Sequence, residues 1–376
     1  MLHQKIIIAG GGPVGLTLAL YLARQNKEVM VIDQKFDYHQ DGRVLALSYA
    51  SMQILARVNG WLSTKISPIR CVQISHAGLG ISNIDAKSVG LPELGYTIAY
   101  SGLCDHLFNQ AKSHGNIQLL NAKINNVNDS SNYALVDCVD LAGNSLTYTS
   151  DLLIMAEGGK LLASDKKRIE HDYQQKAVIA KIRVKAPVGD VAFERFTGIG
   201  PLVLLPHDSY YVVVWALDNE LAEKVLIDND LFIKMLDEHY TTRLGGASLS
   251  GSISSFPLKL TQAQTRLKKR LILLGNSAQT VHPISAQGLN LGLRDVATLA
   301  HLLEANQEIN PDNIQRFDEF RSNDANSVIG FTHFLASFVE KPGRLFQHLR
   351  GAGIIGLSNL PFIQNKIAKR LIYGSK

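Results

Sequence analysis

Four residues near the N-terminus have the types and the spacing of a dinucleotide site. Gly10, Gly12 and Gly15 occupy the glycine positions of G-x-G-x-x-G, and Asp33 follows 18 residues after the last of them. The first glycine permits a tight turn, the second lets backbone approach a pyrophosphate, and the third lets a helix pack against a strand. A carboxylate at the position of Asp33 can accept hydrogen bonds from ribose hydroxyls. This spacing predicts an adenine dinucleotide; the alternative is a glycine-rich turn in an ordinary α/β protein.

The elements around these glycines supply the geometry that such a site needs. Apolar residues 6–9 predict a buried parallel strand, residues 15–25 a helix, and residues 29–32 a second apolar strand that ends at Asp33. The three elements form a complete β-α-β unit. The N-terminus of its helix presents free N–H groups and partial positive charge to phosphate.

A second loop of this kind follows residues 152–156. This short apolar run ends in Glu157, Gly158 and Gly159. An acid with glycines at the end of a parallel strand is typical of a ligand-facing loop in an open α/β sheet. A plain turn is the alternative here.

A third strand end lies in the C-terminal third of the chain. Residues 271–274 predict a buried strand that ends in Gly275-Asn276, and a loop with Pro283 and Gly288 then opens a long helix. We expect this strand beside the first β-α-β unit, so that its loop faces the same crevice. Asn276 can hydrogen-bond a polyol chain. The start of the helix can stabilise negative charge by about 0.3–1 kcal/mol.

Two further side chains are ambiguous from the sequence alone. Arg43 lies just beyond the ribose-binding acid, which favours a cofactor contact over a plain surface cation. His282 precedes a proline in the third loop and is a candidate catalytic residue, although a histidine in that setting is more often structural. The sequence contains no convincing nucleophile triad.

The middle of the chain predicts a second sheet. Residues 71–99 and 177–260 contain short alternating runs, interrupted by one helix from about residue 219 to residue 239. They predict a mostly antiparallel unit that forms the lid or floor of a substrate cavity. Most of its aromatic residues are expected to be core. The candidate substrate contacts are Phe193, Arg195 and Trp215.

Composition narrows the class of protein. The 376 residues are 46% hydrophobic, which is enough for a large core, and no apolar run has the length of a membrane span. The first strand begins at the N-terminus, so we expect no signal peptide. Three separated cysteines predict a reducing cytoplasm and neither a disulfide framework nor a metal site. A net charge of +5, without a basic stripe interleaved with aromatic residues, argues against nucleic-acid binding.

The C-terminal residues 328–376 predict helices. In residues 361–373 the apolar side chains Phe362, Ile363, Ile367 and Leu371 recur at helical spacing, with Lys366, Lys369 and Arg370 between them. A basic amphipathic helix suits a membrane surface or a partner groove. A helix that caps the core is the alternative.

Together these motifs resemble the flavin-dependent aromatic hydroxylases of the para-hydroxybenzoate hydroxylase class. The similarity covers nearly the whole chain and is greater to the branch that hydroxylates the ring in ubiquinone biosynthesis. Residues 41–47 and 192–206 also resemble that branch, and the Gly-Asn-Ser-Ala-Gln run at residues 275–279 is most similar to the 2-polyprenyl-6-methoxyphenol hydroxylases. The resemblance implies a mixed α/β fold, with a Rossmann-like FAD-binding domain interleaved with an antiparallel-sheet substrate domain and followed by C-terminal helices.

The same resemblance implies domain boundaries. The FAD-binding domain would comprise residues 1–70, 97–170 and 263–330, and the substrate domain residues 71–96 and 171–262. Residues 331–376 would form the C-terminal helical segment.

Carried over by position, the resemblance also implies cofactor contacts. Gly10, Gly12 and Gly15 would hold the FAD pyrophosphate, Asp33 the adenosine ribose, and Asn276 the ribityl chain or pyrophosphate. Arg43 would contact the cofactor, and Glu157-Gly158 would lie at a loop associated with NAD(P)H-linked contacts. The residues expected against the isoalloxazine are Pro283, Gly288, Leu289 and Asn290.

The implied reaction is a ring hydroxylation. NAD(P)H reduces FAD, dioxygen then forms a flavin C4a-hydroperoxide, and an electrophilic oxygen reaches a polyprenylated phenol. The cofactor carries this chemistry, so no protein nucleophile is required. The implied location is cytoplasmic, peripheral on the inner face of the membrane, beside other ubiquinone-biosynthesis proteins.

Departures from the family pattern leave alternatives open. Glu157 stands where Asp is usual, Ala286 stands where Gly is usual, and Asp105 lies near a position that often carries Arg or Gln. These changes motivate a non-catalytic assembly subunit with weakened FAD binding as one alternative. Another ring hydroxylase of the same pathway is a second, and a different flavoenzyme on the same fold, such as a geranylgeranyl reductase or a halogenase, is a third. A halogenase would normally show a Trp-x-Trp-x-Ile motif, whereas Trp61 and Trp215 are isolated.

Overall fold

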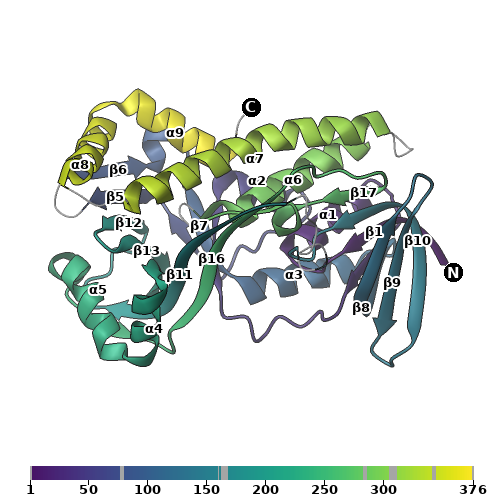
Figure 1. The fold of residues 1–376 in the computed structure, drawn as a ribbon, viewed down its shortest axis with the longest axis horizontal. Coiled ribbons are helices and arrows are strands. Elements are labelled where there is room, and N and C mark those ends of the chain that lie inside the picture. Colours follow the sequence, from purple (N-terminus) through teal and green to yellow (C-terminus); the bar gives the residue numbers. More distant parts are fainter. Residues whose placement is uncertain are drawn as a thin grey trace.

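The chain folds around two large β-sheets and a smaller one, as seen in a computed structural model (Figure 1). The structure describes residues 2–76, 80–159, 161, 168–282, 286–304, 311–340 and 344–374, without the side chains of residues 241–243, 311–313, 335–340, 344–350 and 357. Within these ranges, no helix has both the length and the apolar character needed to cross a membrane.

The first sheet contains the predicted β-α-β unit. Its strands are β1 (Leu2–Ala9), β2 (Val29–Asp33), β8 (Ile117–Asp129), β9 (Ala134–Asp140), β10 (Ser145–Met155) and β17 (Leu271–Leu273). The parallel part has the order β8-β2-β1-β10-β17, and β9 pairs antiparallel with residues 122–129 of β8 and residues 145–150 of β10. Because β1, β10 and β17 are parallel neighbours, their carboxyl ends meet at one edge of the sheet. The loops that begin with Gly10, Glu157 and Gly275 therefore start side by side.

Helices cover one face of this sheet. α1 (Pro13–Arg24), α3 (Tyr100–Lys112) and α6 (Gln287–Glu304) pack there in one hydrophobic cluster. Alternate residues of β1 point to opposite faces, so Ile6 and Ile8 meet these helices while Ile7 and Ala9 enter the core on the other side. This double coverage explains why β1 is a continuous apolar run.

The second sheet is long and mostly antiparallel. Its order is β18 (Gln279–Thr280), β16 (Ser254–Ala263), β11 (Arg168–Val184), β14 (Tyr210–Asp218), β13 (Gly200–His207), β12 (Val191–Thr197), β5 (Cys71–His76) and β6 (Gly80–Asp85), with β15 (Ala247–Leu249) beside β11. Only the pairing of β12 with β5 is parallel among these described neighbours. α4 (Asn219–Ile227) and α5 (Asn229–Leu244) cover one face of this sheet.

The remaining elements connect the two large sheets. β3 (Val44–Ser48), β7 (Gly95–Ala99) and β4 (Ile66–Ile69) form the small sheet, and α2 (Tyr49–Ala56) follows β3. A 3₁₀ helix, η1 (Ala86–Val89), follows β6, and another, η2 (Gly275–Ser277), follows β17. α7 (Pro311–Glu340) runs along the molecule toward α8 (Arg344–Asn359) and α9 (Pro361–Tyr373), and α8 lies against β5 and β6 (Figure 1).

The structure confirms the predicted mixed α/β class with C-terminal helices. One expected element is wrong, because the single helix predicted over residues 219–239 is two helices separated at Asp228. The Asp228 carboxylate accepts a hydrogen bond from the Leu231 N–H at 2.9 Å and caps the second helix, as the Asp218 carboxylate caps the first. The β7 strand, expected in the second sheet, belongs to the small sheet instead.

Candidate functional site

The N-terminal glycine loop combines two tightly packed glycines with one that faces open space. A Cβ at Gly10 would lie 2.5 Å from the Ala156 carbonyl oxygen, and one at Gly15 would lie 1.9 Å from the Gly10 carbonyl oxygen. Both positions therefore need glycine for the fold itself. At Gly12 the nearest atom to an added Cβ is the Tyr100 hydroxyl, 3.5 Å away. Gly12 thus leaves an approach to the backbone at the start of α1, where phosphate is favoured.

Asp33 is fixed beside this loop by two backbone donors. Its Oδ2 accepts a hydrogen bond from the Gly11 N–H at 2.6 Å, and its Oδ1 accepts one from the Lys35 N–H at 3.0 Å. A carboxylate has about four acceptor sites, so capacity for ribose hydroxyls remains.

The third loop packs directly against the first. A Cβ at Gly292, in α6, would lie 2.8 Å from a Val14 methyl and 3.2 Å from the Gly275 Cα. Gly275 has φ +55°, and its own Cβ would meet the same valine at 3.2 Å. Small residues at these two points let α1, η2 and α6 approach closely. This packing places the Gly12 loop and the start of α6 on one cleft.

The cleft opens into a large cavity of about 1580 Å³. Single-ligand pockets commonly measure about 300–1,000 Å³, so this volume has room for a dinucleotide and a second molecule. The predicted cofactor residues that line it are Gly12, Asp33, Arg43, Glu157, Gly158, Asn276, Gly288, Leu289 and Asn290. Gly10 and Gly15 lie behind the lining and shape it. Pro283, also predicted here, lies outside the described residues.

Arg43 projects into the cavity wall from the start of β3. Its guanidinium makes a bidentate interaction with Asp41, with Nε 2.8 Å from Oδ1, and its Cζ lies 4.2 Å from the centre of the Tyr100 ring. The hydrogen bond to Asp41 raises the pKa of Arg43, although burial opposes this. A held, planar cation beside Gly12 suits recognition of an anionic or aromatic group.

Two of the predicted contacts are engaged within the protein. Glu157 folds back onto its own loop, where Oε1 accepts hydrogen bonds from the Gly159 N–H at 2.9 Å and the Ser277 hydroxyl at 3.1 Å. The Asn290 side chain accepts hydrogen bonds from Ser48 N–H and Ser51 Oγ and donates to two carbonyl groups. Glu157 therefore ties the second loop to the third, and Asn290 ties α6 to β3.

A buried charge cluster supports the third loop from behind. Asp295 accepts hydrogen bonds from the Gly275 N–H at 3.2 Å, from Arg321 at 2.7 Å and from Arg266 at 3.2 Å. Burial raises the pKa of Asp295, but Arg266 and Arg321 outweigh it and keep that pKa below its ordinary value. Sequence reasoning missed this cluster, although Arg294-Asp295 inside an otherwise apolar helix was a signal for it.

His282, the candidate catalytic residue, is not among the described residues that line the cavity. Its ring is buried and lies 4.9 Å from the Tyr173 ring in an edge-on contact. Burial, with a smaller effect of His333, lowers its pKa to about 4. A neutral, packed imidazole fits the structural interpretation rather than the catalytic one.

The structure also corrects the predicted substrate contacts. Trp215 is fully buried beside Phe232 of α5, on the sheet face away from the cavity. Arg195 lies over the Tyr240 ring on that same face, with 5.8 Å from Cζ to the ring centre. Phe193 touches the cavity, but its ring packs 5.9 Å from Tyr240. Strand alternation directs Trp215 and Arg195 toward the helices, whereas Phe193 also reaches the cavity lining.

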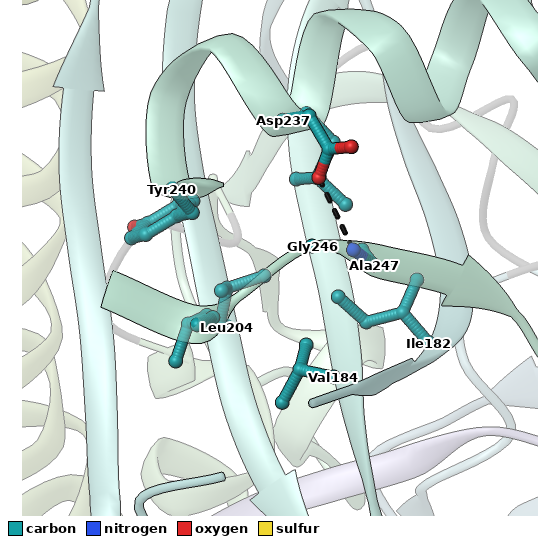
Figure 2. Close-up of a pocket in the computed structure, with 9 residues that line it drawn as sticks. Ile182, Val184, Leu204, Asp237, Tyr240, Gly246 and Ala247 are labelled. Atoms are coloured by element: carbon teal, nitrogen blue, oxygen red, sulfur yellow. Dashed lines mark hydrogen bonds between the residues drawn. The ribbon is translucent and has the colours of Figure 1, made fainter. Parts of the chain in front are cut away.

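Among the described residues, a small void lies on the helix-covered side of the sheet. Figure 2 shows the small void there, which measures about 10 Å³ and is closed by a hydrogen bond of 3.2 Å from the Ala247 N–H to Asp237 Oδ1. A space of this size holds at most about one water molecule. The large cavity on the opposite face is therefore the candidate site.

The other strand face supplies the residue that sequence reasoning missed. Glu194 lies between Phe193 and Arg195 and lines the cavity with Ala192 and Phe196. The period-two alternation of β12 was the signal that could have identified it.

This arrangement defines a class. A β-α-β glycine loop, a ribose-binding carboxylate and a helix start that meet on one cleft make a dinucleotide-binding protein of the flavoprotein type. The open Gly12 backbone and the acceptors of Asp33 and Asn276 fit FAD. The FAD binding domain family matches residues 3–331, so the chain belongs to that family.

Relatives within this class carry named activities. The chain is 27% identical to the 3-demethoxyubiquinol 3-hydroxylase of Escherichia coli, across 80% of this chain and 79% of that protein. It is 24% identical to the ubiquinone hydroxylase UbiM of Neisseria meningitidis, across 98% of this chain and 85% of that protein. The fold matches the p-nitrophenol 4-monooxygenase PnpA of Pseudomonas putida with a TM-score of 0.84 at 14% identity, over the full length of both chains.

These findings bear on the predicted chemistry. The expected FAD cofactor and the expected class of FAD-dependent NAD(P)H monooxygenase, with dioxygen as co-substrate, are confirmed. The expected resemblance to the ubiquinone-pathway branch is confirmed at the level of the branch.

Proposed function

We propose that the protein hydroxylates the aromatic ring of a polyprenylated phenol in ubiquinone biosynthesis, as a 2-polyprenyl-6-methoxyphenol hydroxylase. One observation carries the proposal: a single cavity extends from Gly12 and Asn276 to the C-terminal helices. Such a cavity suits a cofactor at one end and a long apolar substrate at the other. Another ring hydroxylase of the same pathway is the second candidate, because the E. coli relative is named a 3-demethoxyubiquinol 3-hydroxylase.

The two large sheets divide this work. Residues 1–70, 97–170 and 263–330 form the FAD-binding domain, residues 71–96 and 171–262 the substrate domain, and residues 331–376 the C-terminal helical segment. The division is supported by the strand content of the two sheets, because β5, β6 and β11 to β16 lie in the second one.

Proposed cofactor contacts follow from the cleft. The backbone around Gly12 binds the pyrophosphate, Asp33 the ribose, and Asn276 the ribityl chain, while Gly288 and Leu289 lie against the ring system. FAD, when bound, supplies the oxygen-transfer chemistry. Arg43 holds the cofactor through its fixed guanidinium, and Asn290 positions β3 and α6 around it.

The wall that faces the substrate is apolar and excludes water. Val203, Leu205, Val212 and Val214 line the cavity from β13 and β14. Their aliphatic side chains favour a ring and a prenyl chain over a polar ligand. Excluding water from this wall also limits wasteful breakdown of reactive species.

The far end of the cavity is made by the C-terminal helices. Ile363, Ile367 and Leu371, expected to form the apolar face of a basic helix, line the cavity from α9. Phe362 is 79% exposed, and Leu360 and Ile363 are also exposed. The polyprenyl chain enters here from an anionic membrane surface, which Lys366, Lys369 and Arg370 attract. The protein is accordingly cytoplasmic and peripheral on the inner membrane face.

Reconstitution tests the proposed reaction. Purified protein loaded with FAD should consume NADH or NADPH and hydroxylate a 2-methoxy-6-polyprenylphenol, with the product identified by mass spectrometry. Absence of product while flavin remains bound would reject the substrate. A deletion strain that accumulates a different quinone precursor would favour the second candidate.

Vesicle binding tests the proposed membrane surface. Phe362→Asp should reduce co-sedimentation with vesicles containing anionic lipid while leaving FAD affinity unchanged, because Phe362 is exposed and outside the cavity lining. Phe320→Asp, at another exposed phenylalanine on α7, is the matched control. If both variants sediment with the vesicles as much as the unchanged protein does, α9 has no role in membrane binding.

A further inference from the structure

Glu194 places a carboxylate in the apolar wall of the cavity. Glu194 pairs across the sheet with Ile74 of β5 and with Val203 of β13. Val203 pairs with Val214, and Val214 pairs with Ile179. All five side chains line the cavity. Glu194 is therefore the single polar member of a row that crosses five strands.

Residues along its own strand are equally apolar. Ala192 and Phe196 flank Glu194 on the cavity face of β12 and line the same space. Phe196 and Ile74 form a cluster with Ile354 of α8. The carboxylate is thus enclosed by hydrocarbon on both neighbouring strands and along its own.

The protein supplies no partner for this carboxylate within its described residues. Glu194 makes no hydrogen bond and no ion pair there, and burial alone raises its pKa to about 7. Lys259, by contrast, is a charged cavity residue that has a partner. It lines the cavity from β16, is exposed, and lies 3.4 Å from Asp172. The Glu194 side chain is half-buried and faces the cavity, so an apolar ligand that displaced water there would leave the carboxylate without a partner, and a ligand that fits must provide one.

The chemistry of that partner follows from the wall. A metal ion would need further ligands, and the described residues contain no group of three or more His, Cys, Asp or Glu side chains that could hold one. An aromatic ring with a hydroxyl group matches the site, because the ring suits the aliphatic row and the hydroxyl is a single donor. We propose that Glu194 accepts the hydrogen bond of the phenol hydroxyl and orients the ring. The proposal rests on the proposed function.

The same contact can carry a proton. When the phenol O–H bond breaks, an O–H bond forms at a Glu194 Oε, and the electron pair left on the phenol oxygen makes the ring more nucleophilic. Bound FAD would supply an electrophilic hydroxyl oxygen to a ring carbon, and as the ring regains aromaticity the proton of that carbon would neutralise the oxygen anion left on the donor. The Glu194 proton returns to the phenol oxygen, so the carboxylate is regenerated. Glu194 therefore acts as a catalytic residue by direct contact with substrate.

Binding of a matched pair of ligands tests the assignment without turnover. The probes are a 2-methoxyphenol with a short 6-alkyl chain and its O-methyl ether, titrated into the oxidised FAD-loaded protein near pH 8 and followed by the flavin spectrum. The ether keeps the shape but cannot donate. A hydrogen bond to a charged group contributes about 1.5–3 kcal/mol, so the phenol should bind about 10- to 100-fold more tightly.

Variants assign this preference to the carboxylate. Glu194→Leu should bring the ratio of the two dissociation constants close to one, and Glu194→Gln should restore part of it because the amide oxygen still accepts. Ile179→Val, in the same row, changes wall volume but keeps the carboxylate and should keep the ratio. FAD affinity and melting temperature are measured for each variant. If Glu194→Leu fails to bind FAD, a ratio in Glu194→Gln that is lower than in the unchanged protein supports the role of the carboxylate.

The outcomes separate the two proposals. An unchanged ratio in Glu194→Leu, or in Glu194→Gln where the leucine variant does not fold, overturns the role of Glu194 alone. If neither probe binds the unchanged FAD-loaded protein, the proposed substrate class is wrong and the inference fails with it.

Discussion

Two glycine-to-alanine substitutions in the N-terminal glycine loop should have different effects. Gly15→Ala should impair folding, and Gly12→Ala should impair binding of FAD. Gly15→Ala places a Cβ 1.9 Å from the Gly10 carbonyl oxygen, whereas contacts of this kind need more than about 3 Å. Either β1 or α1 must move. We expect a loss of about 3 kcal/mol or more in the free energy of unfolding, because the new methyl meets a backbone carbonyl in the core, which cannot turn aside as a flexible side chain could.

Gly12→Ala should have the opposite profile. Gly12 has φ −76°, which alanine adopts without strain, and the added methyl meets only the Tyr100 hydroxyl at 3.5 Å. The apoprotein should therefore keep its stability within about 0.5 kcal/mol. The methyl occupies the approach to the backbone that the pyrophosphate needs. Loss of one charge-assisted hydrogen bond costs about 1.5–3 kcal/mol, so the FAD dissociation constant should rise about 10- to 100-fold.

Two measurements on the same samples decide the matter. Thermal unfolding of apoprotein reports stability, and quenching of FAD fluorescence on titration reports affinity. Gly102→Ala is the control, because Gly102 lies in α3 with no neighbour within 4 Å of an added Cβ. It should leave FAD affinity unchanged and raise stability by up to about 1 kcal/mol. Unchanged FAD affinity in Gly12→Ala would refute the placement of the pyrophosphate.

Three further predictions address the surrounding structure. Asp295→Asn leaves the buried Arg266 without its countercharge and leaves Arg321 with Asp324 alone, so it should lower the free energy of unfolding by about 3–5 kcal/mol in denaturant titrations. Ala286→Gly should raise the melting temperature slightly, because Ala286 has φ +50° and glycine adopts that conformation without cost; a lower temperature would contradict this. Because the pKa of Glu194 is raised from 4.5 to about 7, the folded state holds that proton to higher pH than the unfolded state. The associated stability is present below pH 4.5 and is lost as pH rises through 7. Glu194→Gln should therefore gain stability relative to the unchanged protein between pH 4 and pH 8, by at most about 3 kcal/mol, and a constant difference across that range would exclude the effect.

The β-α-β unit was predictable from the sequence because its signals are local. Apolar runs, helical spacing and glycines at fixed offsets specify β1, α1 and β2 without reference to distant residues. The strand at residues 271–274 was expected beside this unit, whereas in the structure β10 lies between β17 and β1, so the loops share one sheet edge although the two strands are not direct neighbours.

The wall of the substrate cavity was not predictable in the same way. One face of the second sheet packs against α4 and α5, and the other face lines the cavity. Side-chain alternation in the sequence separates the two faces but does not show which of them lines the cavity. Aromatic type pointed to Trp215, and the true cavity residue, Glu194, lies on the other face. The Asp295 cluster was also missed, because it joins α6, α7 and a distant loop that only tertiary packing brings together.

The role of the C-terminal helix α9 was also not decided by the sequence. Ile363, Ile367 and Leu371 form an apolar stripe that suits a membrane, a partner or a core equally well. Only the packing of α9 shows that these residues line the cavity.

Turnover with isotopically labelled dioxygen tests the central claim most directly. The FAD-loaded protein is supplied with NADH or NADPH and a 2-methoxy-6-polyprenylphenol, and the mass of the product is measured by mass spectrometry. The proposed function predicts one labelled oxygen atom on the ring, and none when the label is in water. Oxygen derived from water, or no hydroxylated product from protein with flavin bound, would contradict it.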